Sequence, residues 1–221
     1  MKRYLPFIII AAVATLTVGA GVMLYRVKQR AVPTASTTSK PVDKTSSETA
    51  DTFEGKAAHV RGAPDAPVTL EVFGDFQCPS CATVSGLIGK LEQEYGPRLR
   101  VVFRHFPLAM HAHAMDAALA AEAAGLQGRF WEMHDLLFAN QTALGTKDLN
   151  KYAEQLSLDT HRFHDELKHR TYEDRVREDF RRGVANGVYG TPGLFINGVR
   201  HDGALDLNSL NSFLLQFKET S

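Results

Sequence analysis

The sequence predicts an α/β domain in which two parallel strands are followed by a long helical insertion and a closing hairpin. Val68–Phe73 and Leu99–Arg104 are apolar and rich in β-branched residues, and a helical pattern separates them. Strand, helix and strand in this order indicate a βαβ unit with parallel strands. A helical stretch over about 108–187 then precedes a hairpin. We therefore expect a single small α/β domain over 58–221.

The helix between the two strands has a clear start and a clear end. Gly74 and Asp75 end the first strand, and Gly96-Pro97 predicts the end of the helix. Between them, apolar residues recur every three or four positions, which is typical of a helix with one buried face. These residues are Val84, Leu87, Ile88, Leu91 and Tyr95.

The insertion repeats this helical spacing several times. Thr146 is expected to cap one of its helices, and Asp159 is expected to start another. The expected helices are an alanine-rich one over 112–124 and then those over 130–138, 146–156, 159–167 and 172–184. Phe130 and Trp131 are expected in the core. The expected solvated residues are His161, His164, His169 and the charged run Glu178–Arg182.

The sheet is expected to resume after Gly190-Thr191-Pro192. Leu194 begins an apolar strand, and Asn197-Gly198 predicts a type I′ turn that joins it to the next strand. Asp206 is expected to cap the last helix.

The N-terminus resembles an export or membrane-insertion segment. Lys2 and Arg3 precede Leu5–Tyr25, an uncharged run of 21 residues that would span about 31 Å as a helix, the thickness of a bilayer core. Two interpretations are open. One is a signal peptide cleaved after the small residues Val18 and Ala20. The other is an uncleaved signal anchor over 1–30. The length of the apolar run and the basic residues that follow it favour this second interpretation.

The next segment, 31–57, is rich in Ser and Thr and has no apolar periodicity, so we expect a flexible linker. The domain is therefore expected to be anchored to a membrane, facing the periplasm or another extracytoplasmic space. The chain has 25 acidic and 25 basic residues. This balance gives no overall field that would attract nucleic acid.

Cys78-Pro79-Ser80-Cys81 contains both cysteines of the chain, at the start of the first helix. Unpaired N–H groups and the helix dipole favour a thiolate at that position. A second thiol one turn later can attack a mixed disulfide formed on the first. This spacing predicts thiol–disulfide exchange. A purely structural disulfide is the weaker explanation, because closing a two-residue loop constrains the unfolded chain little.

Four segments together resemble the DsbA-like thiol–disulfide oxidoreductases of the thioredoxin fold. They are Phe73–Cys81, Phe103–Leu108, Gln127–Asp135 and Gly190–Gly198. The resemblance covers roughly His59 to the C-terminus and implies a thioredoxin fold with an inserted helical subdomain.

The same resemblance assigns roles to the site residues. Cys78 is expected to be an exposed nucleophile and Cys81 a buried resolving thiol. Pro192 is expected to be a cis-proline packed against them, and the Thr191 backbone is expected to pair with a substrate strand. Pro79 and Ser80 are expected to tune the redox potential. The family's strongest oxidants carry a histidine in place of Ser80, so an intermediate potential is expected.

One departure from the family concerns proton transfer. Many relatives carry a carboxylate six residues before the first cysteine, and Val72 stands there in this chain. Glu71 is adjacent, but neighbouring strand residues point to opposite faces. Asp75 is nearer and is also explained as the end of the strand. The proton acceptor for Cys81 is therefore left open between water and a nearby histidine.

The function expected is oxidation of exported proteins that carry thiols, by a monomer that a membrane redox partner reoxidises. Two alternatives remain open: a reductase or isomerase of the same fold, and a metallochaperone that uses the two cysteines as ligands. No cofactor and no resident metal are predicted. His111 and His113, with Met110 and Met115, offer the ligands of a soft copper site, but residues two apart on a helix face different ways. We expect His111 at a helix start and His105 at a strand end.

Overall fold

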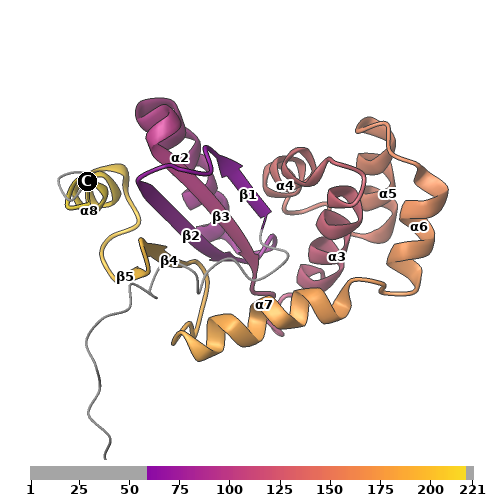
Figure 1. The fold of residues 1–221 in the computed structure, drawn as a ribbon. Helices are drawn as coiled ribbons and strands as arrows, with labels where there is room; N and C mark the ends of the chain where they lie inside the picture. Colours follow the sequence, from indigo (N-terminus) through magenta and orange to yellow (C-terminus); the bar gives the residue numbers. More distant parts are fainter. Residues whose placement is uncertain (1–58, 218–221) are drawn as a thin grey trace, which may run out of the picture. The chain divides into compact units, whose positions relative to one another are not determined.

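The structure, a computed structural model, describes residues 59–217 as a mixed five-stranded sheet with helices (Figure 1). The strands are β1 (His59–Gly62), β2 (Val68–Gly74), β3 (Leu99–His105), β4 (Gly193–Ile196) and β5 (Val199–His201). The helices are α2 (Pro79–Tyr95), the short 3-10 helix η1 (Gly96–Arg98), α3 (Ala114–Gly125), α4 (Phe130–Ala139), α5 (Thr146–Gln155), α6 (Thr160–Lys168), α7 (Glu173–Ala185) and α8 (Leu207–Leu215).

The sheet has the order β1-β3-β2-β4-β5, with β2 in its centre. β2 and β3 are parallel, with Val68 opposite Leu99, and α2 forms the crossover between them. β1 and β4 join this pair in antiparallel orientation. Asn197 and Gly198 have φ values of 47° and 78°, as the expected type I′ turn between β4 and β5 requires. The predicted strands are confirmed, and the sheet is of the mixed thioredoxin-like kind.

The helices α3 to α7 fill the chain between β3 and β4. Figure 1 shows α3 to α6 gathered beside the β1 edge of the sheet. From there, α7 leads the chain back toward β4. Asp159 and Asp206 cap α6 and α8 as expected, accepting hydrogen bonds from Arg162 N and Ser209 N. Two helix starts differ from the prediction. Gly145 rather than Thr146 occupies the cap position of α5, and α3 begins at Ala114.

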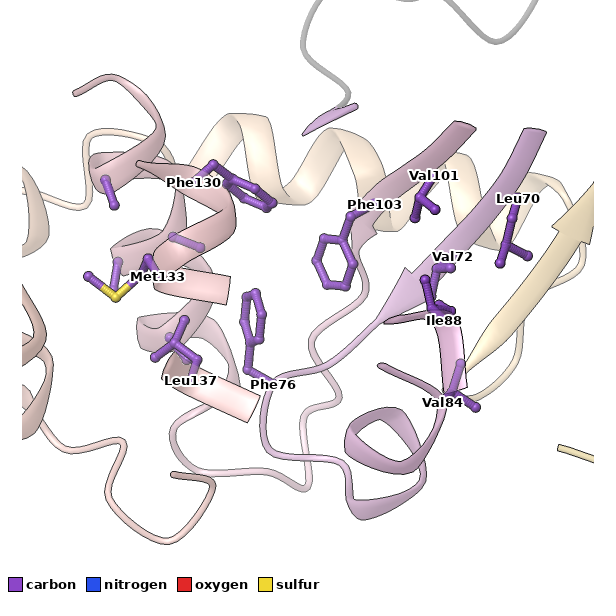
Figure 2. Packing of buried hydrophobic residues seen from close by; sticks show 14 of the residues in the cluster. Leu70, Val72, Phe76, Val84, Ile88, Val101, Phe103, Phe130, Met133 and Leu137 are labelled. Carbon is purple, nitrogen blue, oxygen red and sulfur yellow. The ribbon is translucent and has the colours of Figure 1, made fainter. Parts of the chain in front are cut away.

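One face of the sheet packs against α2 and continues into the helical insertion. Leu70 and Val72 of β2 lie beside Val101 and Phe103 of β3 on this face (Figure 2). Phe76, which is 1% exposed, stacks on Phe103 with ring centroids 5.2 Å apart. Phe76 lies just before the first cysteine, so its burial fixes the loop that carries the site. Burying one such side chain stabilises a fold by about 1.5–3 kcal/mol.

The other face of the sheet carries a buried ionic network against α7. Arg104 of β3 hydrogen-bonds Glu71 of β2, and its Nη1 donates to Asp179 Oδ1 of α7 at 3.1 Å. Arg175 Nη1 lies 2.8 Å from Asp179 Oδ2. The expectation that Asp179 is solvated is therefore wrong: it is 1% exposed. The charged sequence around it gives no sign that Arg104, from a distant strand, neutralises it.

Gly183 of α7 marks a point of close packing on this second face. A Cβ added there would lie 2.6 Å from the Phe106 ring and 2.9 Å from the Phe73 ring. We expect Gly183→Ala to lower the free energy of unfolding by about 1–3 kcal/mol through overpacking. The matched control is Gly89→Ala in α2, where a Cβ would meet nothing within 4 Å. That change is expected to be neutral or to stabilise by about 1 kcal/mol through helix propensity. Urea denaturation of both variants checks this, and equal effects would contradict it.

The predicted anchor over 1–30 and linker over 31–57 lie outside the described residues. Within 59–217, no helix is both long enough and apolar enough to cross a bilayer.

Candidate redox site

The two cysteines lie between the end of β2 and the first turn of α2. Cys78 has an extended backbone, with φ −76° and ψ 120°, and occupies the cap position of the helix. Its carbonyl accepts hydrogen bonds from the N–H groups of Cys81 and Ala82 at 3.1 and 3.3 Å. Pro79 is the first helical residue, where its missing N–H removes no helical hydrogen bond. The sequence thus places one sulfur directly at a helix N-terminus.

Both cysteines are free thiols, and both are buried. Cys81 is 3% exposed, as expected of a resolving thiol, but Cys78 is only 7% exposed. The expectation that Cys78 is exposed is therefore wrong. The physical reason is the loop before β4, which covers the sulfur: Cys78 Sγ lies 3.4 Å from the Thr191 carbonyl oxygen, to which it donates when it is protonated.

The sheet register brings this loop to the cysteines. Gly193, the first residue of β4, pairs with Phe73 near the end of β2, so the residues just before β4 lie beside the start of α2. The Thr191–Pro192 peptide bond is cis.

The surroundings shift the two thiol pKa values in opposite directions. The pKa of Cys78 falls from 9.0 to about 5, chiefly because the Cys81 thiol donates a hydrogen bond to its sulfur. Burial alone would raise this pKa. Hydrogen bonds from Thr191 and from the N–H groups of Ser80 and Cys81 lower it further. The pKa of Cys81 is strongly raised, first by that same hydrogen bond and then by burial. At neutral pH the reduced pair therefore holds a thiolate on Cys78 and a thiol on Cys81.

Asp75 has a larger role than ending β2. Its buried carboxylate accepts hydrogen bonds from the N–H groups of Gln77 and Leu108 at 2.7 and 2.8 Å, and lies 2.8 Å from His111 Nδ1. These contacts tie the loop before Cys78 to the segment after β3. His111 is not at a helix start as expected, but lies in the turn before α3, while His105 does end β3.

Gln141 also holds the cysteine loop and was not predicted. Its Nε2 donates to the carbonyls of Phe76 and Cys78, both at 2.8 Å. The residue lies just after α4, 63 residues from Cys78 along the chain. No spacing or composition signal in the sequence distinguishes it from any other loop glutamine.

Glu71 is not placed to accept the Cys81 proton. Glu71 faces α7 and bonds to Arg104, whereas Val72 lies on the α2 face with Cys81. This confirms that Glu71 and Val72 point to opposite faces.

One cluster of the described residues has a metal-ligand pattern, and it contains neither cysteine. His59, His105 and Glu122 have ligand atoms within 4.8 Å of one another. Both Nε2 atoms lie 2.9 Å from the same Glu122 oxygen, and the Arg175 guanidinium lies 3.7 Å from it. The distances are those of hydrogen bonds, and a neighbouring guanidinium opposes a cation. Met110 is 83% exposed, and His111 pairs with Asp75, so the copper-like set is not assembled.

The family model described as thioredoxin matches residues 54–215. A Salinispora arenicola protein named Na+/H+ antiporter NhaA 1 is 45% identical over 155 residues, which is 70% of this chain and 24% of that protein. A Mycolicibacterium gilvum protein of the same name is 44% identical over 155 residues, covering 69% and 25%. The chain spans about a quarter of the length of these relatives.

Solved structures share the fold. Oxidised BdbD from Bacillus subtilis aligns with a TM-score of 0.65 and 23% identity over 72% of this chain and 91% of that one. A thioredoxin-like oxidoreductase from Silicibacter pomeroyi aligns with a TM-score of 0.68 and 22% identity, over 76% of this chain and 96% of that one. DsbA2 from Pseudomonas aeruginosa aligns with a TM-score of 0.60 and 24% identity, over 74% of this chain and 97% of that one. The family match over 54–215 shows that the chain belongs to the thioredoxin family, and these solved structures share its fold.

Proposed function

We propose that the protein forms disulfides in exported proteins through the Cys78–Cys81 pair. The observation that carries this proposal is the position of Cys78 at the N-terminus of α2 beside the Cys81 thiol, which lowers the pKa of Cys78 to about 5. A stabilised thiolate favours the reduced form of the pair, and a pair that favours its reduced form oxidises other thiols.

The reaction runs by two displacements. A substrate thiolate attacks Cys78 Sγ of the Cys78–Cys81 disulfide, the S–S bond breaks, and its electron pair leaves on Cys81, which takes up a proton. The second substrate thiolate then attacks the substrate sulfur of the mixed disulfide. The substrate gains a disulfide, Cys78 leaves as a thiolate, and the protein pair has accepted two electrons.

The surface around the pair suits an extended peptide. Tyr189 and Met110 are 87% and 83% exposed, on the loops before β4 and after β3 that pack against the cysteine segment. Large exposed apolar side chains are typical of interaction surfaces. The Thr191 backbone is proposed to pair with the substrate strand, which would place a substrate cysteine beside Cys78.

The location belongs to the proposal as well. The segment over 1–30 is proposed to anchor the chain in a membrane, with the domain in the periplasm or another extracytoplasmic space. A membrane redox partner would return the pair to its disulfide. One structural neighbour, from Salmonella enterica, is described as a periplasmic thioredoxin-like protein, which supports this location.

The redox potential of the Cys78–Cys81 couple in glutathione buffers tests the direction of electron flow. We expect a value between about −120 and −200 mV, together with oxidative refolding of a reduced substrate protein. A potential near about −270 mV without oxidative refolding would instead favour a reductase. Metal bound in one-to-one ratio to the purified protein, and lost in Cys78→Ser or Cys81→Ser, would favour the metallochaperone.

Ser80 is proposed to tune this potential. Its hydroxyl is a weaker donor than a protonated imidazole, so Ser80→His is expected to stabilise the Cys78 thiolate further and to raise the potential by at least about 30 mV, a tenfold change in the equilibrium constant. Thr83→His, on the exposed first turn of α2 but outside the dipeptide, is the matched control. Equal redox potentials for wild type and Ser80→His would show that the Pro79-Ser80 dipeptide does not set the potential.

A further inference from the structure

A small cavity lies behind the buried cysteine. Its lining includes Val72 of β2, Cys81 and Ser85 of α2, Phe103 of β3, and His134 and Phe138 of α4. The space open to the centre of a water molecule is ≈ 10 Å³, about the room for one water. Its lining includes Cys81, Ser85 and His134, whose thiol, hydroxyl and imidazole can each hydrogen-bond a water, together with the polar side chains of Arg61 and Trp131. None of the described residues that line it carries a carboxylate.

Cys81 needs a proton acceptor at this place. The hydrogen bond to Cys78, and then burial, raise the pKa of Cys81, so it is a thiol at neutral pH. Only the thiolate attacks a disulfide, so the proton must leave before Cys81 can resolve a mixed disulfide. Val72 supplies no base, and Glu71 faces the opposite side of the sheet. Among the residues that line the cavity, His134 is the group that can accept a proton near neutral pH.

His134 is oriented for this role by its neighbour. It is 4% exposed, and its Nδ1 lies 2.8 Å from Asp135 Oδ1. A carboxylate only accepts, so Nδ1 carries the hydrogen and Nε2 keeps a free lone pair. In the described part of the chain, no protein group bonds to Nε2. Rings of Phe103 and Phe138 hold the imidazole, with centroids 4.9 and 4.8 Å away.

The path from His134 to solvent is short. The Asp135 side chain is 59% exposed, and Arg61 Nη1 lies 3.5 Å from its Oδ2. Arg61 is held in turn by two hydrogen bonds of 2.7 Å to Glu92. Besides these groups, His105 acts on His134 from β3. Burial lowers the pKa of His134 more than Asp135 raises it, so the ring is neutral at neutral pH.

We propose that His134, through one water held in this cavity, takes up and returns the proton of Cys81 during disulfide exchange. This inference rests on the proposed redox role of the cysteine pair. In resolution, the proton passes from Cys81 Sγ to the water while the water gives one to His134 Nε2. The Cys81 thiolate attacks Cys78 Sγ, the Cys78–Cys81 bond forms, and the partner leaves as a thiolate. In the reverse direction the same groups protonate Cys81 as it leaves.

Rapid mixing of reduced protein with an aryl disulfide that releases a coloured thiolate separates the two steps. The first burst of colour reports attack by Cys78, and the second reports resolution by Cys81. We expect His134→Phe, which keeps an aromatic ring in the cage, to slow the second phase at least about tenfold and to leave the first unchanged. His161→Phe, whose side chain is 90% exposed, is the matched control and should match wild type in both phases.

The pH profile distinguishes proton transfer from a packing defect. In wild type, the second phase should fall as pH drops through the pKa of His134, below 6.5, because a protonated ring accepts nothing. In His134→Phe it should instead rise with pH throughout, because hydroxide becomes the acceptor. An unchanged rate and profile in His134→Phe would overturn the inference.

A second variant covers the case in which His134→Phe does not fold. Asp135→Asn changes an exposed side chain and removes a charge that raises the pKa of His134. It should therefore move the pH midpoint of the second phase to lower pH, and an unmoved midpoint would also overturn the inference. A slow first phase in wild type would contradict the proposed function itself, and the relay with it.

Discussion

Replacing Cys81 with alanine is expected to give a protein that forms mixed disulfides and cannot release them. Cys78 would still attack, but the thiol that resolves the intermediate, 3% exposed beside it, would be gone. Catalysed thiol oxidation should fall to the uncatalysed background. Substrates bound covalently to Cys78 should appear on non-reducing gels and disappear on reduction.

The same change also affects the reactivity of Cys78. The Cys81 thiol is the largest cause of the lowered pKa of Cys78, so Cys81→Ala should raise that pKa and require a more alkaline pH for trapping. Cys81→Ser keeps a hydrogen-bond donor, the serine hydroxyl, and should raise the pKa of Cys78 less. Cys78→Ala should trap no substrate. Normal turnover by Cys81→Ala would show that resolution does not use this thiol.

Arg104→Met is expected to lower the free energy of unfolding by about 3–5 kcal/mol. Arg104 neutralises Glu71 and Asp179, and all three side chains are less than 5% exposed. Methionine fills a similar volume but leaves two buried carboxylates without this partner. A loss of this size is a large part of the stability of a domain.

Chemical denaturation of the reduced protein measures this loss. The control is Arg181→Met in α7, whose partner Glu178 and own side chain are 68% and 65% exposed. An exposed pair contributes about 0–1 kcal/mol, so this change should be small. Adding Glu71→Gln to Arg104→Met should recover part of the loss. Equal effects at Arg104 and Arg181 would contradict the account of the buried network.

Local chemistry explains what the sequence could predict. Strand periodicity alone separates Glu71 from Val72, because successive side chains point to opposite faces. Asn197-Gly198 predicts its own turn, because both positions need a positive φ. A cysteine followed by proline at a helix start predicts the lowered pKa of Cys78 before any packing is known, because helix N–H groups lie there in every helix.

Contacts between residues far apart in the chain explain which features the sequence could not predict. Asp179 lies in a run of charges that predicts a solvated surface, yet its partner Arg104 is 75 residues away on a strand of the sheet. Gln141 and His134 come from the insertion and reach the cysteine segment only because α4 packs against α2 and Phe76. The low exposure of Cys78 likewise depends on the loop before β4, which the strand pairing of Gly193 positions.

The ionisation of Cys78 has a consequence for stability as well as for reactivity. Its pKa is lower in the fold than in the unfolded chain, so it stabilises the reduced protein fully above about pH 9 and ceases to do so as pH falls through about 5. The disulfide form has no such contribution. The advantage of the reduced form, and with it the oxidising power of the pair, should therefore shrink as the pH falls over this window.

The most direct test is a pH titration of Cys78 in the reduced protein, followed by thiolate ultraviolet absorbance and by the rate of alkylation. Cys78→Ala gives the background from Cys81. We expect a midpoint of about 5, with an alkylation rate that is nearly constant above it. A midpoint near 9.0, the ordinary value for a cysteine, would contradict the claim that the helix start and Cys81 hold a thiolate at this site.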